Sequence, residues 1–220
     1  MWGYARQSGG LAALVLMAGC GGAILPSLPS SDSDPTPAVP RIALLNGKVI
    51  AAGPNGYCAD PNASNPRDGF AIFATCAALD ADSDEFGFAG VATVQVGPKG
   101  SAIVAGQEAA FVAYLESEDG ARTLSRAGDA QTVTVQSTKE DNGAVSVRFT
   151  DSAPSGVAGE QALQWRAFVD INGYLVTISV RGLKEAPLAR AVGSAMLRQA
   201  IEALFNANAT DSGATGPTDA

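Results

Sequence analysis

The 220-residue chain contains no histidine. Without imidazole, Ser-His-Asp and Cys-His catalysis, histidine-ligated zinc, iron and copper sites, and proton transfer by histidine are all excluded. The four lysines stand at no spacing to a serine that forms a catalytic motif: Lys48, Lys99, Lys139 and Lys184. The Gly-x-Ser-x-Gly elbow, a phosphate-binding glycine loop and a dinucleotide fingerprint are also missing. We therefore expect no cofactor and no enzymatic activity, with paired carboxylates or a Ser-Lys dyad as the remaining routes to hydrolysis.

Positive charge is scarce as well. The chain has 14 lysines and arginines against 22 aspartates and glutamates, so its formal net charge is −8. Nucleic acids and anionic lipid surfaces repel a protein of this charge. The sequence therefore predicts no nucleic-acid partner, and any attachment to a membrane must come from something other than a basic patch.

The N-terminal segment has the pattern of a secretory signal. Its apolar stretch, residues 11–18, has the length of a signal core and is too short for a spanning helix, which needs roughly 20 apolar residues. The stretch ends in Leu16-Met17-Ala18-Gly19-Cys20, with small residues directly before the cysteine. This resembles the lipobox of bacterial lipoproteins, although Leu, Val or Ile is usual at the place of Met17.

The lipobox resemblance implies a signal peptide over residues 1–19 and acyl chains on Cys20. Two or more acyl chains anchor a protein stably. We expect a lipid-anchored protein of the bacterial cell envelope that faces the periplasm. The outer membrane is favoured over the inner, because Gly21 stands where some bacteria read an aspartate as an inner-membrane retention signal.

Two segments have compositions that do not support a core. Residues 20–40 contain five prolines among serines and aspartates. We predict that they form a lipidated, solvated tether that reaches roughly 60 Å. The tail, residues 207–220, is rich in Ala, Thr, Asp and Gly and is predicted to be disordered.

Two cysteines remain after Cys20 is assigned to lipid. Cys58 and Cys76 lie eighteen positions apart in a chain predicted to occupy an oxidising compartment. A redox pair is normally Cys-x-x-Cys, and a zinc site would need two more soft ligands. A structural disulfide is therefore predicted, and it should stabilise the fold by about 3 kcal/mol.

Residues 41–206 are expected to form a single domain, and its firmest element is a hairpin over residues 162–181. Asn172 and Gly173 tolerate the positive φ that a type I′ turn requires. That turn sets the pairs on one face as Ile171 with Tyr174, Val169 with Val176, Ala167 with Ile178 and Trp165 with Val180. The opposite face carries Gln164, Arg166, Phe168 and Asp170. We expect the first face to be core and the second to be mostly exposed to solvent.

A second hairpin is predicted over residues 131–151. A two-residue turn at Asn142 and Gly143 would put the valines of the two strands on opposite faces. A three-residue loop over residues 141–143 restores the match and places Phe149 opposite Val135, so the longer loop is predicted.

The remaining segments complete an α+β pattern. Further strands are predicted at residues 42–45, 48–52, 69–76 and 91–96, and helices at residues 107–117, 121–126 and 187–206. The first helix carries Phe111, Tyr114 and Leu115 at i, i+3 and i+4, and the last has a broad apolar stripe. The predicted fold is an antiparallel sheet built from hairpins, with a middle helix and a C-terminal amphipathic helix packed on the sheet.

Two resemblances follow from these patterns. The strand-turn-strand from Val169 to Val180, directly before the last helix, resembles the Mog1/PsbP-like class of small domains, whose roles are mostly in binding or assembly. The chain also resembles a family of alphaproteobacterial lipoproteins that share the segment Gly56-Tyr57-Cys58. That family carries no established activity, so no functional residue is transferred from it.

One acidic loop has ligand-like spacing. Asp80, Asp82 and Asp84 alternate as the first carboxylates of a calcium loop do, by the preference of calcium for oxygen ligands. However, Glu85 stands where such a loop needs glycine, and Val91 stands where it needs a bidentate glutamate. A solvated acidic loop is the favoured interpretation, with calcium binding as the alternative.

These observations predict a membrane-anchored envelope lipoprotein with a non-enzymatic role in binding or in supporting assembly, acting on another envelope protein. The alternative is an envelope module that binds a small ligand or calcium. A third hypothesis is a histidine-free hydrolase of cell-wall material. Two carboxylates facing each other in a cleft would favour the hydrolase, whereas an apolar pocket would favour ligand binding.

Overall fold

The computed structural model describes residues 37–80, 90–155 and 158–209. They lie in one structural unit, which begins at Pro35. The predicted signal peptide, Cys20, most of the tether, Asp82, Asp84 and the tail from position 210 lie outside the described residues.

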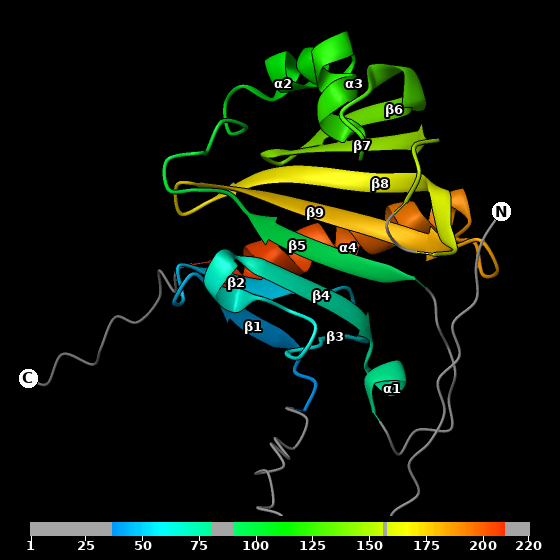
Figure 1. Ribbon diagram of the computed structural model, residues 1–220. Helices are drawn as coiled ribbons and strands as arrows, with labels where there is room; N and C mark the ends of the chain where they lie inside the picture. The colour runs from blue at the N-terminus through cyan, green and yellow to red at the C-terminus, as the bar shows by residue number, and fades with distance from the viewer. Residues whose placement is uncertain (1–36, 81–89, 156–157, 210–220) are drawn as a thin grey trace, which may run out of the picture. The chain divides into compact units, whose positions relative to one another are not determined.

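A seven-stranded antiparallel sheet is the centre of this unit, in the order β3-β4-β5-β9-β8-β7-β6 (Figure 1). Its strands are β3 (Tyr57–Ala59), β4 (Phe70–Thr75), β5 (Val91–Val96), β6 (Val133–Asp141), β7 (Ala144–Asp151), β8 (Glu160–Ile171) and β9 (Tyr174–Leu183). A separate two-stranded sheet consists of β1 (Arg41–Leu44) and β2 (Val49–Ala52). The α-helices are α1 (Cys76–Leu79), α2 (Glu108–Leu115), α3 (Glu118–Leu124) and α4 (Arg190–Asn208). The fold is α+β, as the sequence predicts, with antiparallel sheets and a C-terminal helix.

The β8–β9 hairpin has the predicted turn and register. Asn172 and Gly173 have φ values of 52° and 84°, which are the left-handed conformations of a two-residue turn. Ile171 pairs with Tyr174, and the register continues to Trp165 opposite Val180. A local turn preference therefore determines the pairing of the two longest strands.

The β6–β7 hairpin corrects the predicted three-residue loop. Asp141 pairs directly with Ala144, so Asn142 and Gly143 form a two-residue turn. The extra residue is taken up by a β-bulge at Gln136, beyond which Val135 lies opposite Phe149 as predicted. Because Gln136 is unpaired, each side chain of β6 between Gln136 and the turn faces the opposite side of the sheet from the one predicted.

The N-terminal part contains one strand that the sequence analysis missed. β3 is only three residues long and pairs with β4 at the edge of the sheet. Cys58 of β3 forms a disulfide with Cys76, the first residue of α1. The bond therefore joins the edge strand β3 to the residue that directly follows β4.

Helix α4 covers one face of the large sheet, together with the β1–β2 sheet (Figure 1). Trp165 of β8 is 1% exposed and packs in this core. Gly193 of α4 lies directly against the indole ring, so the helix approaches the sheet where it has no side chain. The amphipathic stripe of the last helix thus covers its own sheet, as predicted.

The opposite face is not mostly exposed, and the prediction for it was wrong over part of the sheet. Helices α2 and α3 cover β6, β7 and part of β8 (Figure 1). Val145, Val147, Phe149 and Phe168 are buried beneath them with Leu115. The side chains of β7 and β8 supply apolar surface on this face too, and the helices remove it from water.

Candidate functional site

The helices α2 and α3 meet at a close backbone contact on the second face of the sheet. Ser117 caps α3: its hydroxyl accepts a hydrogen bond from the N–H of Gly120 (3.2 Å) and donates one to the carbonyl of Tyr114 (2.6 Å). A Cβ at Gly120 would lie 2.5 Å from the Cα of Leu115. Only glycine permits this approach, which holds the two helices as one pair.

The segment that leads into α2 is held by one carboxylate at the end of β8. The carboxylate of Asp170 accepts hydrogen bonds from the backbone N–H groups of Ile103 (3.1 Å), Val104 (2.7 Å) and Ala105 (2.8 Å). Val104 is buried in the core beneath the helices, whereas Ile103 is exposed. The carboxylate therefore places the side chain of Ile103 at the surface beside α2.

An apolar cavity of about 510 Å³ lies between α2 and the sheet. We call it the α2 cavity; its lining consists of Ile103, Gln107, Ala110, Phe111, Tyr114, Thr123, Phe168 and Leu175. The rings of Phe111 and Phe168 pack edge to face with centroids 5.0 Å apart. The hydroxyl groups of Tyr114 and Thr123 are 2.5 Å apart, which ties α2 to α3 at the rim.

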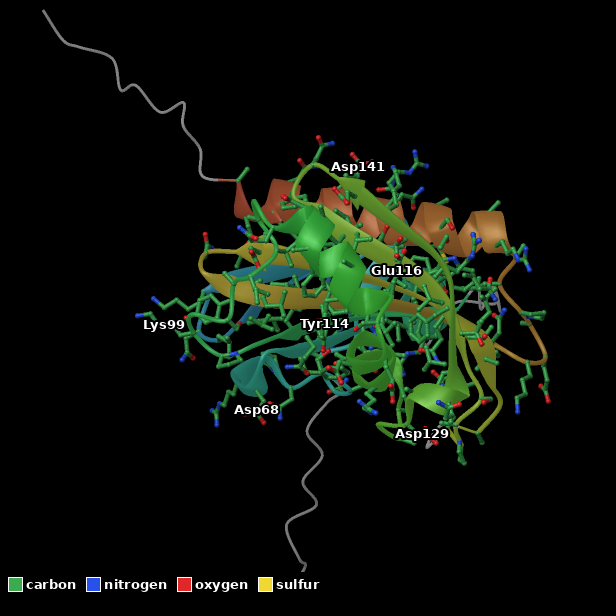
Figure 2. The ribbon with its side chains drawn as sticks, turned by 90° about the horizontal axis from the view of Figure 1, so that it is seen from above. Asp68, Lys99, Tyr114, Glu116, Asp129 and Asp141 are labelled. Carbon is green, nitrogen blue, oxygen red and sulfur yellow. A yellow bond between two sulfur atoms is a disulfide. The ribbon has the colours of Figure 1, made fainter. Side chains whose placement is uncertain are left out.

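Two side chains at this cavity are unusually exposed for their size. Ile103 is 56% exposed and Tyr114 is 39% exposed, and the third exposed large hydrophobic of the described residues is Val192 of α4. Figure 2 shows Tyr114 beside the helix pair, with Glu116 nearby. The cavity is therefore open to solvent through an apolar rim.

The helix pair around the cavity is acidic. The segment from Glu108 to Leu124 carries four carboxylates, those of Glu108, Glu116, Glu118 and Asp119, and one arginine, Arg122, which pairs with the last two. Glu116 also accepts a hydrogen bond from Thr138 of β6 (2.7 Å). The helix pair beside this apolar cavity thus carries an excess of negative charge.

A buried ionic network lies at the end of α3, next to β7 and β8. Arg126 contacts both buried carboxylates: its Nη1 is 2.7 Å from Glu160, and its Nε is 3.4 Å from Asp151. Burial tends to raise the pKa of Asp151, but the N–H groups of Arg126 and Ala153, the hydroxyl of Thr132 and the Arg126 charge together hold it below its ordinary value. Both carboxylates are thus held by an arginine between them.

A second arginine lies on β8 beside this network. Burial, followed by the nearby charge of Arg181, lowers the pKa of Arg166 to about 10. Its guanidinium lies 5.2 Å from the ring centroid of Phe149 and donates to Ser179 (3.3 Å). These contacts join β8 to β7 and β9, whereas Arg126 joins the segment after α3 to the sheet.

The residues singled out from the sequence do not gather into one site. Cys58 and Cys76 form their disulfide at the sheet edge. Asp80 is the residue that follows α1, while Asp82 and Asp84 lie outside the described part of the chain. Within the described residues, no group of three Cys, Asp or Glu side chains is arranged to hold a metal ion, and no helix there is long and apolar enough to cross a membrane.

The sequence analysis missed the α2 cavity. It placed Phe111 and Tyr114 on one helix face but assigned Phe168 to a solvent-exposed face of the sheet. Phe168 lies between Arg166 and Asp170 on this face of β8, and a large apolar side chain at that position was the available signal that another apolar element covers the face. The pairing of Phe111 with Phe168 depends on residues 57 positions apart, so spacing alone could not reveal it.

Comparison with known proteins finds structural likeness only. No protein-family model matches the chain, and no curated protein matches it. A structure of a mutant of the protein Mog1 has 13% identity and a TM-score of 0.43, over 76% of this chain and 93% of that chain. The Ran-binding protein Mog1p of Saccharomyces cerevisiae has 13% identity and a TM-score of 0.42, over 76% of this chain and 92% of that chain.

Proposed function

We propose that this protein is a non-enzymatic binding module of the bacterial cell envelope that docks a partner protein at the α2 cavity. One observation carries the proposal. Of the three exposed large hydrophobic side chains in the described residues, two line this one cavity, Ile103 and Tyr114. Scattered exposed hydrophobics are normal on a surface, but hydrophobics gathered at a concavity mark interaction sites.

The exposed rim favours a protein partner over an enclosed small molecule. A small-molecule pocket buries most of its ligand and its own lining. Here Ile103 and Tyr114 project at the edge, where an apolar side chain of a partner would insert and cover them. Tyrosine is also enriched among the residues that dominate protein interfaces.

Charge adds a second requirement on the partner. The α2–α3 pair carries four carboxylates against one arginine, so the partner surface around the inserted side chain should be basic. Such a complex should form faster at low salt, because screening weakens the attraction between exposed charges.

The proposed absence of catalysis is supported by chemistry as well as by the missing histidines. The two buried carboxylates, Asp151 and Glu160, are each paired with Arg126 and do not face each other across an open cleft. A hydrolase that uses two carboxylates needs both directed at the substrate. This arrangement favours binding over cell-wall hydrolysis.

Membrane attachment through acyl chains on Cys20 is the second part of the proposal. Its support is the sequence Leu16-Met17-Ala18-Gly19-Cys20 and the proline-rich segment that follows. The lipid would hold the domain at the membrane, and the tether would let the α2 cavity reach a partner.

The test is crosslinking and mass spectrometry on native membranes with the full chain. We expect a stoichiometric partner with the wild type and with Val192→Asp, which places a charge on the exposed hydrophobic that lies outside the cavity. Ile103→Asp should reduce recovery roughly tenfold or more, equivalent to 1.4 kcal/mol. Equal recovery with the two variants would contradict docking at the α2 cavity.

A parallel arm tests the anchor. Cys20→Ser should remove the mass of the acyl chains from the peptide that contains position 20. If this peptide has the same mass in the wild type and in Cys20→Ser, apart from the difference between cysteine and serine, the lipid anchor is wrong, whatever the result at Ile103.

A further inference from the structure

A second cavity lies on the opposite face of the sheet from the α2 cavity. Helix α4 packs on β8, β9 and β2, and the β6–β7 hairpin extends beyond it. We call the resulting space of about 430 Å³ the α4 groove; its lining comes from β6, β7, Trp165 and one side of α4. Figure 2 shows Asp141 at the tip of this hairpin, beside α4.

The β-bulge at Gln136 determines which side chains of β6 face the α4 groove. Below the bulge, Ser137 pairs with Arg148 and Lys139 pairs with Ser146. Arg148 and Ser146 share a face with Ala144, which packs in the core beneath α4. Lys139 is therefore turned toward α4.

The opposite wall leaves room because its helix positions are small. Ala191, Ser194 and Ala195 of α4 line the groove, followed by Arg198 and Ile201. Most of this lining is apolar, and the polar groups stand around it. The space therefore suits a ligand with an apolar body.

The groove is basic in a chain whose net charge is −8. Lys139, Arg148 and Arg198 line it, and Asp141 is the only carboxylate in its lining. Asp141 pairs with Lys139 at 2.6 Å. The guanidinium of Arg148 donates to the neutral amide of Gln136 (3.3 Å), and that of Arg198 has no hydrogen bond or ion pair within the described residues. In the part of the chain that the structure describes, these two guanidinium groups therefore have no ion-pair partner.

The side chain of Trp165 belongs to the lining of the groove. Trp165 is 1% exposed and lines the groove, and its indole N–H has no acceptor among the described residues. A buried donor without a partner destabilises the fold. The nitrogen is covered by protein atoms, so Trp165 contributes to the groove lining without offering this donor to a ligand.

We propose that the α4 groove binds a small organic anion, a carboxylate carried on an apolar body. The guanidinium groups of Arg148 and Arg198 would hold the carboxylate, since planar forks match its two oxygens. The apolar body would lie along Ala191, Ala195 and Ile201, at the edge of the groove that Trp165 lines. This goes beyond docking at the α2 cavity, from which the sheet separates it.

Trp165 makes the proposal directly measurable. The chain has two tryptophans, Trp2 and Trp165, so Trp2→Phe leaves Trp165 as the only one. The full chain with Trp2→Phe and Cys20→Ser, which carries no acyl chains, is titrated with decanoate below its micelle concentration. We expect a saturable change in Trp165 emission, with decanol, which lacks the charge, and acetate, which lacks the body, each roughly tenfold weaker or more.

Variants on this background locate the site. Arg148→Gln and Arg198→Gln should each weaken decanoate roughly tenfold. Arg67→Gln makes the same change at an exposed arginine remote from the groove and should leave binding unchanged. Thermal unfolding of each variant establishes that it is folded.

Three results would overturn the proposal. No binding of decanoate by fluorescence or calorimetry would exclude the site. Equal binding of decanoate and decanol, with no effect of the arginine substitutions, would mean non-specific apolar partitioning. Loss of decanoate binding in Ile103→Asp would place the ligand in the α2 cavity instead. The two proposals are tested separately: if decanoate binds the α4 groove while Ile103→Asp still recovers the protein partner, only the proposal for the α2 cavity fails.

Discussion

For Gly193→Ala, helix propensity and core packing predict changes of opposite sign in the free energy of unfolding. Gly193 lies inside α4 and is buried against Trp165. A Cβ added there would lie 2.6 Å from Cδ2 of the indole and closer still to Cε2 and Cζ2. Real Cβ atoms do not come this close to other atoms, so the helix or the ring must move.

The expected magnitude follows from two terms. Alanine in place of glycine in a helix interior ordinarily stabilises by roughly 0.5–1 kcal/mol. Overpacking a core typically costs about 1–3 kcal/mol, and a rigid ring that is 1% exposed places this contact at the upper end. We expect a net loss of about 2 kcal/mol, or roughly 4–8 °C in Tm for a domain of this size.

Urea unfolding followed by circular dichroism measures this loss. Ser194→Ala is the matched control, because it adds alanine at an exposed position one residue along the helix and should stabilise by less than about 0.7 kcal/mol. In a Trp165→Phe background the penalty of Gly193→Ala should shrink, because the smaller ring leaves space for the methyl group. A Gly193→Ala protein as stable as the wild type would refute the packing of α4 on Trp165.

Two further predictions concern the second face and the sheet edge. The pKa of Asp151 is lowered in the folded state, so its contribution to stability is present above the unfolded pKa of about 4 and is lost as the pH falls through the folded pKa; the free energy of unfolding should fall more steeply below pH 4 in the wild type than in Asp151→Asn, and parallel curves would contradict this. The double variant Cys58→Ala with Cys76→Ala should lose about 3 kcal/mol in urea unfolding, and reductant should destabilise the wild type but not the variant.

The sequence was sufficient to predict a structure wherever that structure depends on a short segment alone. The Asn172-Gly173 turn needs positive φ at both positions, and the alternation of Trp165, Ala167 and Val169 then selects the face toward α4. The stripe of the last helix and the antiparallel α+β class follow from similar local periodicity.

The β6–β7 hairpin marks where local information ends. A three-residue loop and a two-residue turn with a bulge both bring Val135 opposite Phe149. They differ in the residues between, and only the bulge turns Lys139 toward α4. The turn preference of Asn142 and the burial of Val135 are both satisfied when the extra residue lies in the strand.

The sequence by itself determined the fold class, the β8–β9 register and the face of α4 that is buried, because each depends on neighbours within a turn or a helical period. Tertiary structure alone decided where the two cavities lie. The α2 cavity needs Phe111 to meet Phe168 beneath a helix pair, and the α4 groove needs a hairpin that extends beyond the helix. Such spaces arise from the shape of packed elements, which no periodicity along one segment records.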